Sequence, residues 1–268
     1  CLTDNDICLI DIGSDKDAGR KVRQHLDDNG CHLVAIYNTN SNADHIGGNK
    51  YLQAQTGCRI YAPGIERDFT LHPILEPSFL YGGFPPRELR HKFLLAQESE
   101  AEELTADLLP EGFEMIPLPG HFFDMVGFRT PDDTVYLADC LSGRETLDKY
   151  RIGFIYDVAA YLDTLDRRKG MTAKNFVPAH AAACGEIAEL AQYNIDKVNE
   201  VQGDILALCD KPRSFDEVLK ALFDRYGLTM NFEQYALVGS TVRSYLTWQK
   251  QAGRLRAKFV DNRLLFQA

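Results

Sequence analysis

The chain has 268 residues, of which 45% are hydrophobic and 25% are charged, and its formal net charge is −10. This length can bury a full core, either as one large domain or as one domain with a small appendage, and the composition is that of an ordinary globular protein. No apolar run approaches the roughly 18 residues that cross a bilayer, so we expect no membrane segment.

Residues 1–62 alternate strand-like apolar runs with amphipathic segments. In chain order we expect a strand at 7–12, a helix at 15–29, a strand at 32–37, a helix at 49–56 and a strand at 59–62. The first helix carries Val22 and Leu26 one turn apart and ends at Gly30. Such alternation, continued to about residue 180, predicts a layered α/β architecture.

Residues 63–95 interrupt this alternation. They contain five prolines and the pair Gly82-Gly83 among several aromatic residues. The segment is too punctuated for regular structure and too apolar for a disordered linker, so we expect an ordered insertion over 63–110. It either roofs a site or only packs against the body. Its acidic stretch, from Glu98 to Asp107, is expected to be one solvated helical face.

Three further motifs each end a strand-like segment. Strands are expected at 113–118, 126–129 and 134–137, a helix at 157–165, and a strand from residue 175 that leads into His180. The motifs are Pro119-Gly120-His121, Ala138-Asp139-Cys140 and Pro178-Ala179-His180. α/β folds usually place their chemistry at the carboxyl ends of strands, where these motifs lie.

The C-terminal part has a different character. We expect a connecting helix at 186–211 and a capping box at Ser214 that opens a second helix. A third helix follows from Asn231 to about Gln251, and a hairpin at 255–266 turns near Asp261-Asn262. This order predicts a small, mainly helical, winged-helix-like domain over 212–268.

Charge is distributed unevenly along the chain. Nine basic and five acidic residues follow position 211, which leaves a net charge of −14 on the rest. The basic end either contacts nucleic acid or docks on the acidic part of the same molecule, and we favour the second interpretation. The seven cysteines show no paired C-x-x-C spacing, which argues against a disulfide framework and favours a reducing, cytoplasmic location.

The segment Thr39–Gly48 is the most informative part of the chain. It has the sequence T-N-S-N-A-D-H-I-G-G. It resembles the T-H-x-H-x-D-H-x-G-G signature of the metallo-β-lactamase superfamily, with asparagine at both positions of the first histidine pair. The three later motifs match the remaining ligands of that family. The resemblance implies an αββα metallo-β-lactamase sandwich over 1–185, followed by the winged-helix-like appendage.

The resemblance also implies two metal positions. The first would be bound by Asn40, Asn42 and His121, and the second by Asp44, His45 and His180, with Asp139 bridging the two. Asp11 matches a family position that supports these ligands through hydrogen bonds. An amide is a weaker ligand for zinc than an imidazole, so we expect the first position to be weak or empty. We therefore expect one divalent metal, which would be zinc, iron or manganese.

The function implied is hydrolysis of an ester, thioester or phosphoester by a metal-bound hydroxide, with Asp44 and His121 in the catalytic machinery. The amides of Asn40 and Asn42 would donate hydrogen bonds to a small-molecule substrate. The alternative is a catalytically inactive binding or regulatory protein that contacts nucleic acid or a protein partner through its basic C-terminal domain. We rank nucleic acid second, and the sequence indicates no oligomeric state.

Overall fold

The structure is a computed structural model, and it describes residues 5–268. The chain forms two compact units, each built from two segments. Unit 1 comprises Cys1–Pro117 and Phe123–Pro131, and unit 2 comprises Leu118–Phe122 and Asp132–Ala268. Between residues 5 and 268, no helix combines the length and the apolar character that crossing a membrane requires.

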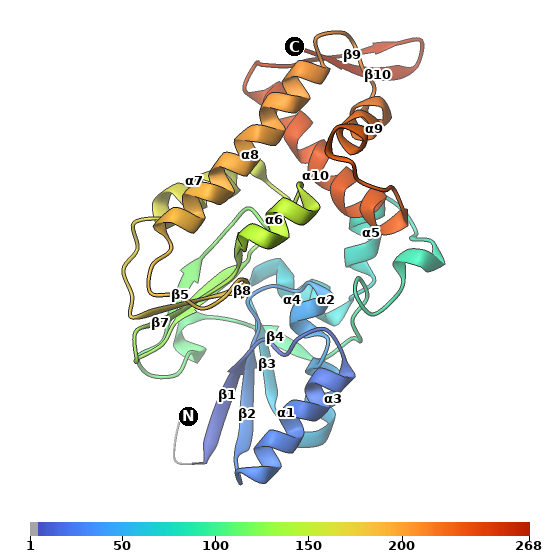
Figure 1. Cartoon of the computed structure of the whole chain (residues 1–268). Helices are drawn as coiled ribbons and strands as arrows, with labels where there is room; N and C mark the ends of the chain where they lie inside the picture. Colours follow the sequence, from blue (N-terminus) through green and yellow to red (C-terminus); the bar gives the residue numbers. More distant parts are fainter. Residues whose placement is uncertain (1–4) are drawn as a thin grey trace. The chain divides into compact units, whose positions relative to one another are not determined.

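Unit 1 contains a sheet of four parallel strands in the order β1-β2-β3-β4 (Figure 1). Two more strands of this unit, β5 and β6, pair antiparallel. The elements in chain order are β1 (Asp6–Ile10), α1 (Lys16–Asp28), β2 (His32–Tyr37), α2 (Ala43–Ile46), α3 (Asn49–Thr56), β3 (Arg59–Ala62), α4 (Gly64–Leu71), α5 (Leu75–Tyr81), η1 (Arg87–Leu89), β4 (Ala101–Glu103), η2 (Ala106–Leu108), β5 (Glu114–Pro117) and β6 (Val126–Arg129).

Both faces of the parallel sheet are buried, as parallel strands require. Side chains alternate between the two faces along each strand. Ile36 and Ile60 belong to one buried cluster with Leu26 of α1 and Leu52 of α3, and α1 and α3 lie side by side in Figure 1. The opposite face carries Tyr37, whose ring stacks on Tyr61 at 5.3 Å. The predicted strands at 32–37 and 59–62 and the predicted helix at 49–56 are confirmed.

The insertion at 63–110 is more regular than the sequence predicts. It contains the two helices α4 and α5, because its prolines and glycines stand mostly at helix ends rather than inside helices. Pro63 precedes α4, and Gly82 ends α5 with a φ of 80°, in the left-handed region that favours glycine. The prediction that this segment lacks regular structure is therefore wrong.

The acidic stretch within this insertion does not form the predicted helix. Its centre, Ala101–Glu103, is strand β4, which pairs parallel with β3. Ala101 is buried while Glu102 is exposed and accepts a hydrogen bond from Arg59 Nε at 2.8 Å. A cross-strand ion pair of this kind suits an exposed sheet edge. The prediction of one solvated helical face is wrong because pairing with β3 determines the conformation of this stretch.

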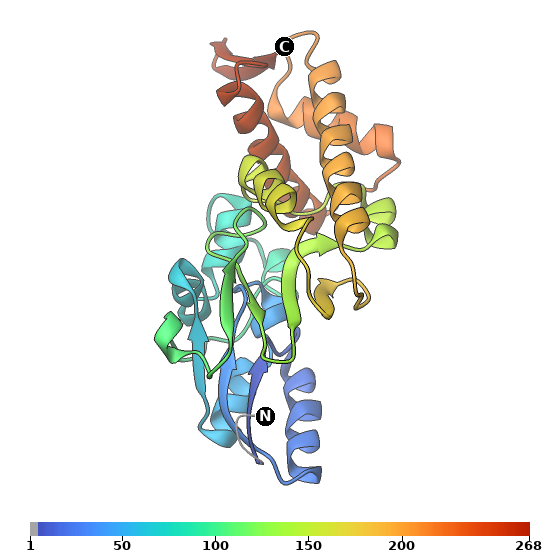
Figure 2. The same ribbon diagram turned by 90° about the vertical axis from the view of Figure 1, so that its left-hand side faces the viewer.

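Unit 2 contains the parallel strand pair β7–β8 and most of the later helices (Figures 1 and 2). The elements in chain order are β7 (Thr134–Ser142), α6 (Arg144–Tyr150), α7 (Val158–Arg168), β8 (Asn175–His180), α8 (Ala188–Leu208), α9 (Phe215–Tyr226), α10 (Phe232–Gln251), β9 (Arg256–Val260) and β10 (Arg263–Gln267). β7 is longer than the predicted strand at 134–137, and it carries Asp139 inside the strand rather than after it.

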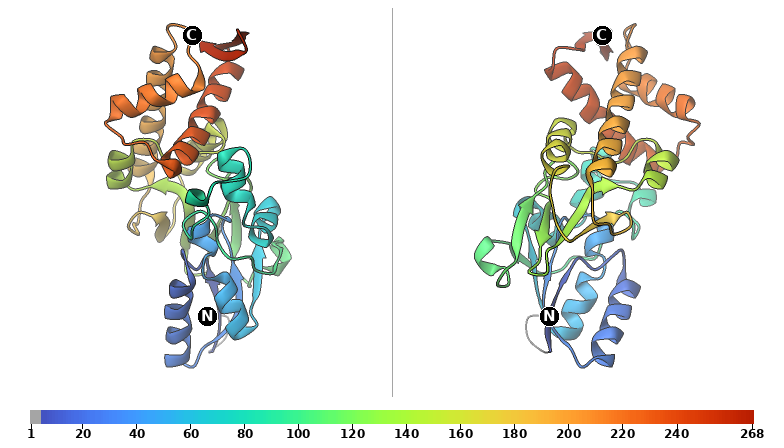
Figure 3. Two further views of the ribbon diagram at one scale, coloured as in Figure 1. Left: turned by 90° about the vertical axis from the view of Figure 1, so that its right-hand side faces the viewer. Right: turned by 60° about the vertical axis from the view of Figure 1, so that its left-hand side comes forward.

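The C-terminal elements match their sequence signals. Ser214 and Glu217 form a reciprocal capping box at the start of α9, and the Asn231 side chain caps α10. The β9–β10 hairpin turns at Asp261 and Asn262, which both have positive φ. α8, α9 and α10 pack together (Figure 3). These helices and the hairpin are confirmed, whereas the winged-helix-like assignment and the domain limits at 185 and 211 remain predictions.

Candidate metal centre

Close backbone contacts in unit 1 hold the loop at residues 39–48, which carries the asparagine-containing motif. A Cβ atom on Gly48 would lie 2.1 Å from Ile12 Cγ2, and one on Gly47 would lie 2.2 Å from the carbonyl carbon of Ser14. Only glycine fits at both positions, which explains the Gly-Gly pair that ends the motif. The backbone N–H of Ile12 donates to the His45 carbonyl at 2.9 Å, so this part of the loop is fixed against the end of β1.

His45 is oriented by Asp11. The imidazole is 4% exposed, and its Nδ1 lies 2.7 Å from Asp11 Oδ2. The Asp11 carboxylate also accepts hydrogen bonds from the backbone N–H and the hydroxyl of Thr39, at 2.8 and 2.6 Å. A carboxylate on one ring nitrogen leaves the other nitrogen as the ligand atom. His45 Nε2 lies 4.0 Å from Asp44 Oδ1, so the two neighbours present a nitrogen and an oxygen donor together.

The side chains of Asn40 and Asn42 form hydrogen bonds with other residues of unit 1. Asn40 Oδ1 accepts a hydrogen bond from the backbone N–H of Asn42 at 2.9 Å. Asn42 Nδ2 donates to Glu76 Oε1 at 3.0 Å, whereas Asn42 Oδ1 is buried and accepts no hydrogen bond from any residue between 5 and 268. One face of the Asn42 amide is therefore fixed by Glu76, a contact that the sequence did not indicate.

Two buried carboxylates support this loop from the insertion. Glu66 Oε2 accepts a hydrogen bond from the backbone N–H of Ser41 at 3.0 Å, and Oε1 accepts one from the backbone N–H of Asp124 at 2.9 Å. Burial raises the pKa of Glu66 to about 7, and burial also raises the pKa of Glu76 well above its usual range. Sequence reasoning missed both residues because they lie 25 and 34 positions away from their partners in the loop.

We expect the Glu66→Gln substitution to flatten the pH dependence of stability. The pKa of Glu66 is about 7 in the folded chain, against an ordinary value of 4.5. Between these two pH values, the folded chain binds a proton that the unfolded chain has released. The free energy of unfolding should therefore fall as pH rises through the window, by about 3 kcal/mol from this group. Urea unfolding at about pH 5 and about pH 8 measures the difference.

The exposed Glu98→Gln substitution is the matched control, because it removes a carboxylate without a buried partner. Glu98→Gln should keep the pH slope of the parent chain. An equal slope in Glu66→Gln and Glu98→Gln would contradict the role given to Glu66.

Unit 2 brings the other three predicted ligands together. Asp139, 4% exposed on β7, lies between two imidazoles. Its Oδ2 is 3.5 Å from His121 Nε2, and its Oδ1 is 3.0 Å from His180 Nε2. His180 ends β8 and is about half exposed, which gives this group an open side. The predicted residues His121, Asp139 and His180 therefore form one cluster.

The loop that carries His121 is fixed by its backbone. Gly120 has a φ of 124°, and a Cβ atom there would lie 2.3 Å from the backbone of Tyr161, so only glycine fits. Its carbonyl accepts hydrogen bonds from the backbone N–H groups of Tyr156 and Asp157 at 3.0 and 2.9 Å. The His121 ring then packs edge-on against Phe154 at 5.3 Å.

These donors fit a divalent metal by their chemistry. Unit 1 presents one imidazole Nε2 atom beside a carboxylate, and unit 2 presents two. Imidazole and carboxylate are ligands of zinc and of other first-row metals. In unit 1 the carboxylate on His45 Nδ1 is the supporting contact that metal-bound histidines usually have. Carboxylates and imidazoles grouped in this way are the residue types that hold the metal ion in metal-dependent hydrolases.

Comparison with known proteins identifies the family. A model of the metallo-beta-lactamase superfamily matches residues 2–180, which is more than half of the chain. The chain therefore belongs to the metallo-β-lactamase superfamily, and the predicted α/β fold class is confirmed. None of the curated proteins compared with the chain matches it.

Solved structures show the same fold. A metallo-beta-lactamase family protein from Thermus thermophilus has a TM-score of 0.72 at 16% identity, over 97% of this chain and 89% of that one. A beta-lactamase domain protein from Burkholderia ambifaria has a TM-score of 0.68 at 16% identity, over 96% and 81%. At these identities the likeness extends to the fold alone.

Proposed function

We propose that the chain is a metal-dependent hydrolase that cleaves an ester, thioester or phosphoester with one tightly bound metal. The arrangement of Asp139 between His121 and His180 is the observation that carries this proposal. In the proposal Asp44, His45 and His180 hold the ion with Asp139. A bound zinc, iron or manganese ion would supply an activated water as the nucleophile.

The chain's own residues have separate roles in this proposal. Asp11 keeps His45 in the tautomer that offers Nε2. His121, packed on Phe154, is placed to exchange a proton with the substrate or the leaving group. Asn42 Nδ2 donates one of its two N–H groups to Glu76, and the second can donate to a substrate oxygen.

The test measures metal and activity on the same sample. We expect about one metal ion per chain by elemental analysis of unchelated protein, and hydrolysis of p-nitrophenyl acetate, of a thioester or of bis-p-nitrophenyl phosphate. A chelator should abolish the activity, and zinc, iron or manganese should restore it. Activity that survives complete metal removal would contradict the proposal.

The alternative is a binding protein that contacts nucleic acid through Arg243, Lys250, Arg254, Arg256 and Lys258. Two of these residues are engaged inside unit 2: Arg243 stacks on Phe215 at 3.7 Å, and Arg254 Nε donates to Gln249 at 2.7 Å. These contacts give no support to a phosphate-binding surface. A mobility-shift assay at low salt remains its direct test.

A further inference from the structure

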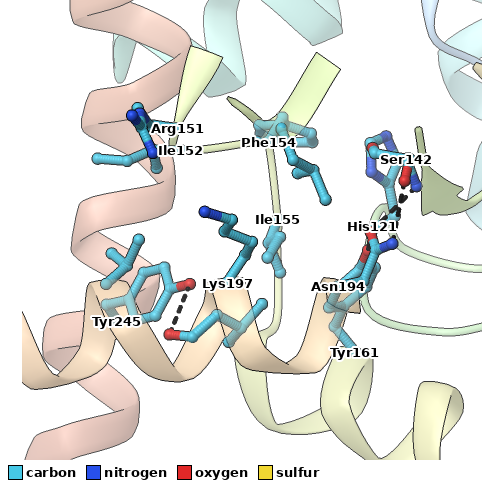
Figure 4. Close-up of a pocket in the computed structure, with 14 residues that line it drawn as sticks. His121, Ser142, Arg151, Ile152, Phe154, Ile155, Tyr161, Asn194, Lys197 and Tyr245 are labelled. Atoms are coloured by element: carbon cyan, nitrogen blue, oxygen red, sulfur yellow. Dashed lines mark hydrogen bonds between the residues drawn. The ribbon is translucent and has the colours of Figure 1, made fainter. Parts of the chain in front are cut away.

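Unit 2 contains a cavity that extends from His121 between α8, α10 and the loop that follows α6 (Figure 4). Its volume is about 50 Å³, which accommodates a small chemical group rather than a large ligand. The polar and aromatic residues at its wall include His121, Arg151, Phe154, Tyr161, Lys197 and Tyr245. This cavity is separate from the metal ligands except at His121.

The formal charge on the cavity wall is positive. Arg151 and Lys197 line it, and none of its lining residues, all of which the structure describes, is Asp or Glu. Burial raises the pKa of Tyr161 and of Tyr245, so both hydroxyls stay neutral. Figure 4 shows Arg151 and Lys197 toward one side of the cavity and His121 on the other. An anionic group would meet two cations there and no carboxylate in the wall itself.

The two cations differ in their partners. Lys197 is 16% exposed and lies 3.3 Å from Asp148 and 3.3 Å from Glu200, which are not in the cavity wall. The guanidinium of Arg151, by contrast, makes no hydrogen bond and no ion pair within 4.0 Å in residues 5–268, although its charge contributes to lowering the pKa of Asp148. Arginine offers five N–H donors in a planar fork that matches a carboxylate or a phosphate. Arg151 is therefore the cation that can still bind an anion.

The backbone at Arg151 is strained. Its φ and ψ are 63° and −48°, and the N–H of Ile152 donates to the carbonyl of Tyr150 at 2.7 Å. These features define a three-residue γ-turn with positive φ, which is rare and costly for a residue with a Cβ atom. Glycine would relieve that strain, yet an arginine stands here with its side chain at the cavity. Strain of this kind is concentrated at ligand-binding positions.

The rest of the wall is mostly apolar and rigid. Ile152, Phe154, Ile155 and Val198 contribute hydrocarbon surface. Asn194 joins α8 to the end of β7 by accepting a hydrogen bond from Ser142 N at 3.1 Å and donating to its carbonyl at 3.0 Å. The cavity therefore combines a fixed apolar lining with one cationic side, which is typical of sites for small ligands.

We propose that this cavity binds an anionic group of the substrate, a carboxylate or phosphate on a short apolar stem, through Arg151 with support from Lys197. The inference rests on the proposed function, because the bond to be cleaved would lie at the His121 end. It names the substrate class as an ester or thioester that carries a second, anionic group. Arg151 and Lys197 then determine specificity without taking part in the chemical step.

The test titrates sodium butyrate and inorganic phosphate into the full chain, before and after chelation, with ligand-observed NMR. We expect at least one of the two anions to bind after chelation, because Arg151 and Lys197 are not metal ligands. Arg151→Gln should weaken that binding by about tenfold or more, as expected for a lost charged hydrogen bond. Arg167→Gln, which removes an exposed arginine of α7, is the control and should leave binding unchanged.

A second variant separates binding from folding. Arg151→Gly should relieve the positive φ and raise the melting temperature, yet it should lose the anion. If only butyrate binds, the anionic group of the substrate is a carboxylate. If only inorganic phosphate binds, that group is a phosphate. The proposal is overturned if neither anion binds the chelated parent chain, or if Arg151→Gln binds as tightly as the parent. Anion binding without metal-dependent hydrolysis would overturn the proposed function and leave this inference standing.

Discussion

Replacing Asp139 with alanine is expected to remove metal binding and hydrolysis together. Asp139 is the carboxylate that both His121 and His180 approach, at 3.5 and 3.0 Å. Losing a partner that only orients a metal ligand costs about 10-fold to 100-fold in metal affinity. Losing a ligand itself should exceed that range, so we expect metal affinity to fall by more than about 100-fold. Zinc titration against a competing chelator measures this loss.

The matched control is Asp166→Ala, an exposed aspartate on α7 that pairs only with Lys169 in the described structure. It should keep the metal affinity of the parent chain. Because Asp139 is buried, circular dichroism should first establish that Asp139→Ala is folded. A folded Asp139→Ala variant with unchanged metal affinity would remove the basis of the proposed function.

Restoring histidine at positions 40 and 42 is expected to raise the metal content from about one to about two ions per chain, since an imidazole binds zinc far better than an amide does. Glu76 Oε1 is 3.0 Å from Asn42 Nδ2. The same oxygen can accept the Nδ1–H of a histidine at 42, as Asp11 does for His45. Elemental analysis of the double variant measures the gain.

Two further variants test this explanation. Adding Glu76→Gln to the double variant should weaken the second ion by about 10-fold to 100-fold, because the orienting carboxylate is lost. Gln55→His places an imidazole on the exposed face of α3 and should leave the metal content at about one. If the folded double variant still holds one ion, the asparagines at positions 40 and 42 do not account for the single metal that we propose.

The candidate ligands could be named from the sequence because each follows a short local signal. The motif residues His45, His121 and His180 stand at the ends of strand-like runs, and those runs form strands. The contacts that support them are long-range and leave no local signal. Asn42 meets Glu76 only because the insertion folds into α4 and α5. The orienting residue Asp11 was predicted from its family position alone.

The missed elements have a common cause. β4 is a strand only through its pairing with β3, and its own sequence of alanine and glutamates favours a helix. α6 was not predicted because its seven residues are too few for a clear apolar period. The strained turn at Arg151 follows α6 and lacks the glycine that usually marks such a conformation.

The two units are interleaved along the chain. Unit 1 takes β6 from beyond the segment Leu118–Phe122, and that segment, which includes His121, belongs to unit 2. No single cut therefore yields both bodies whole. A fragment ending at Pro117 would also expose the edge of β5. During synthesis, the first body remains incomplete until the ribosome has released Pro131. Dissection of this chain into halves is thus ruled out by its connectivity, and inserted tags belong at its ends.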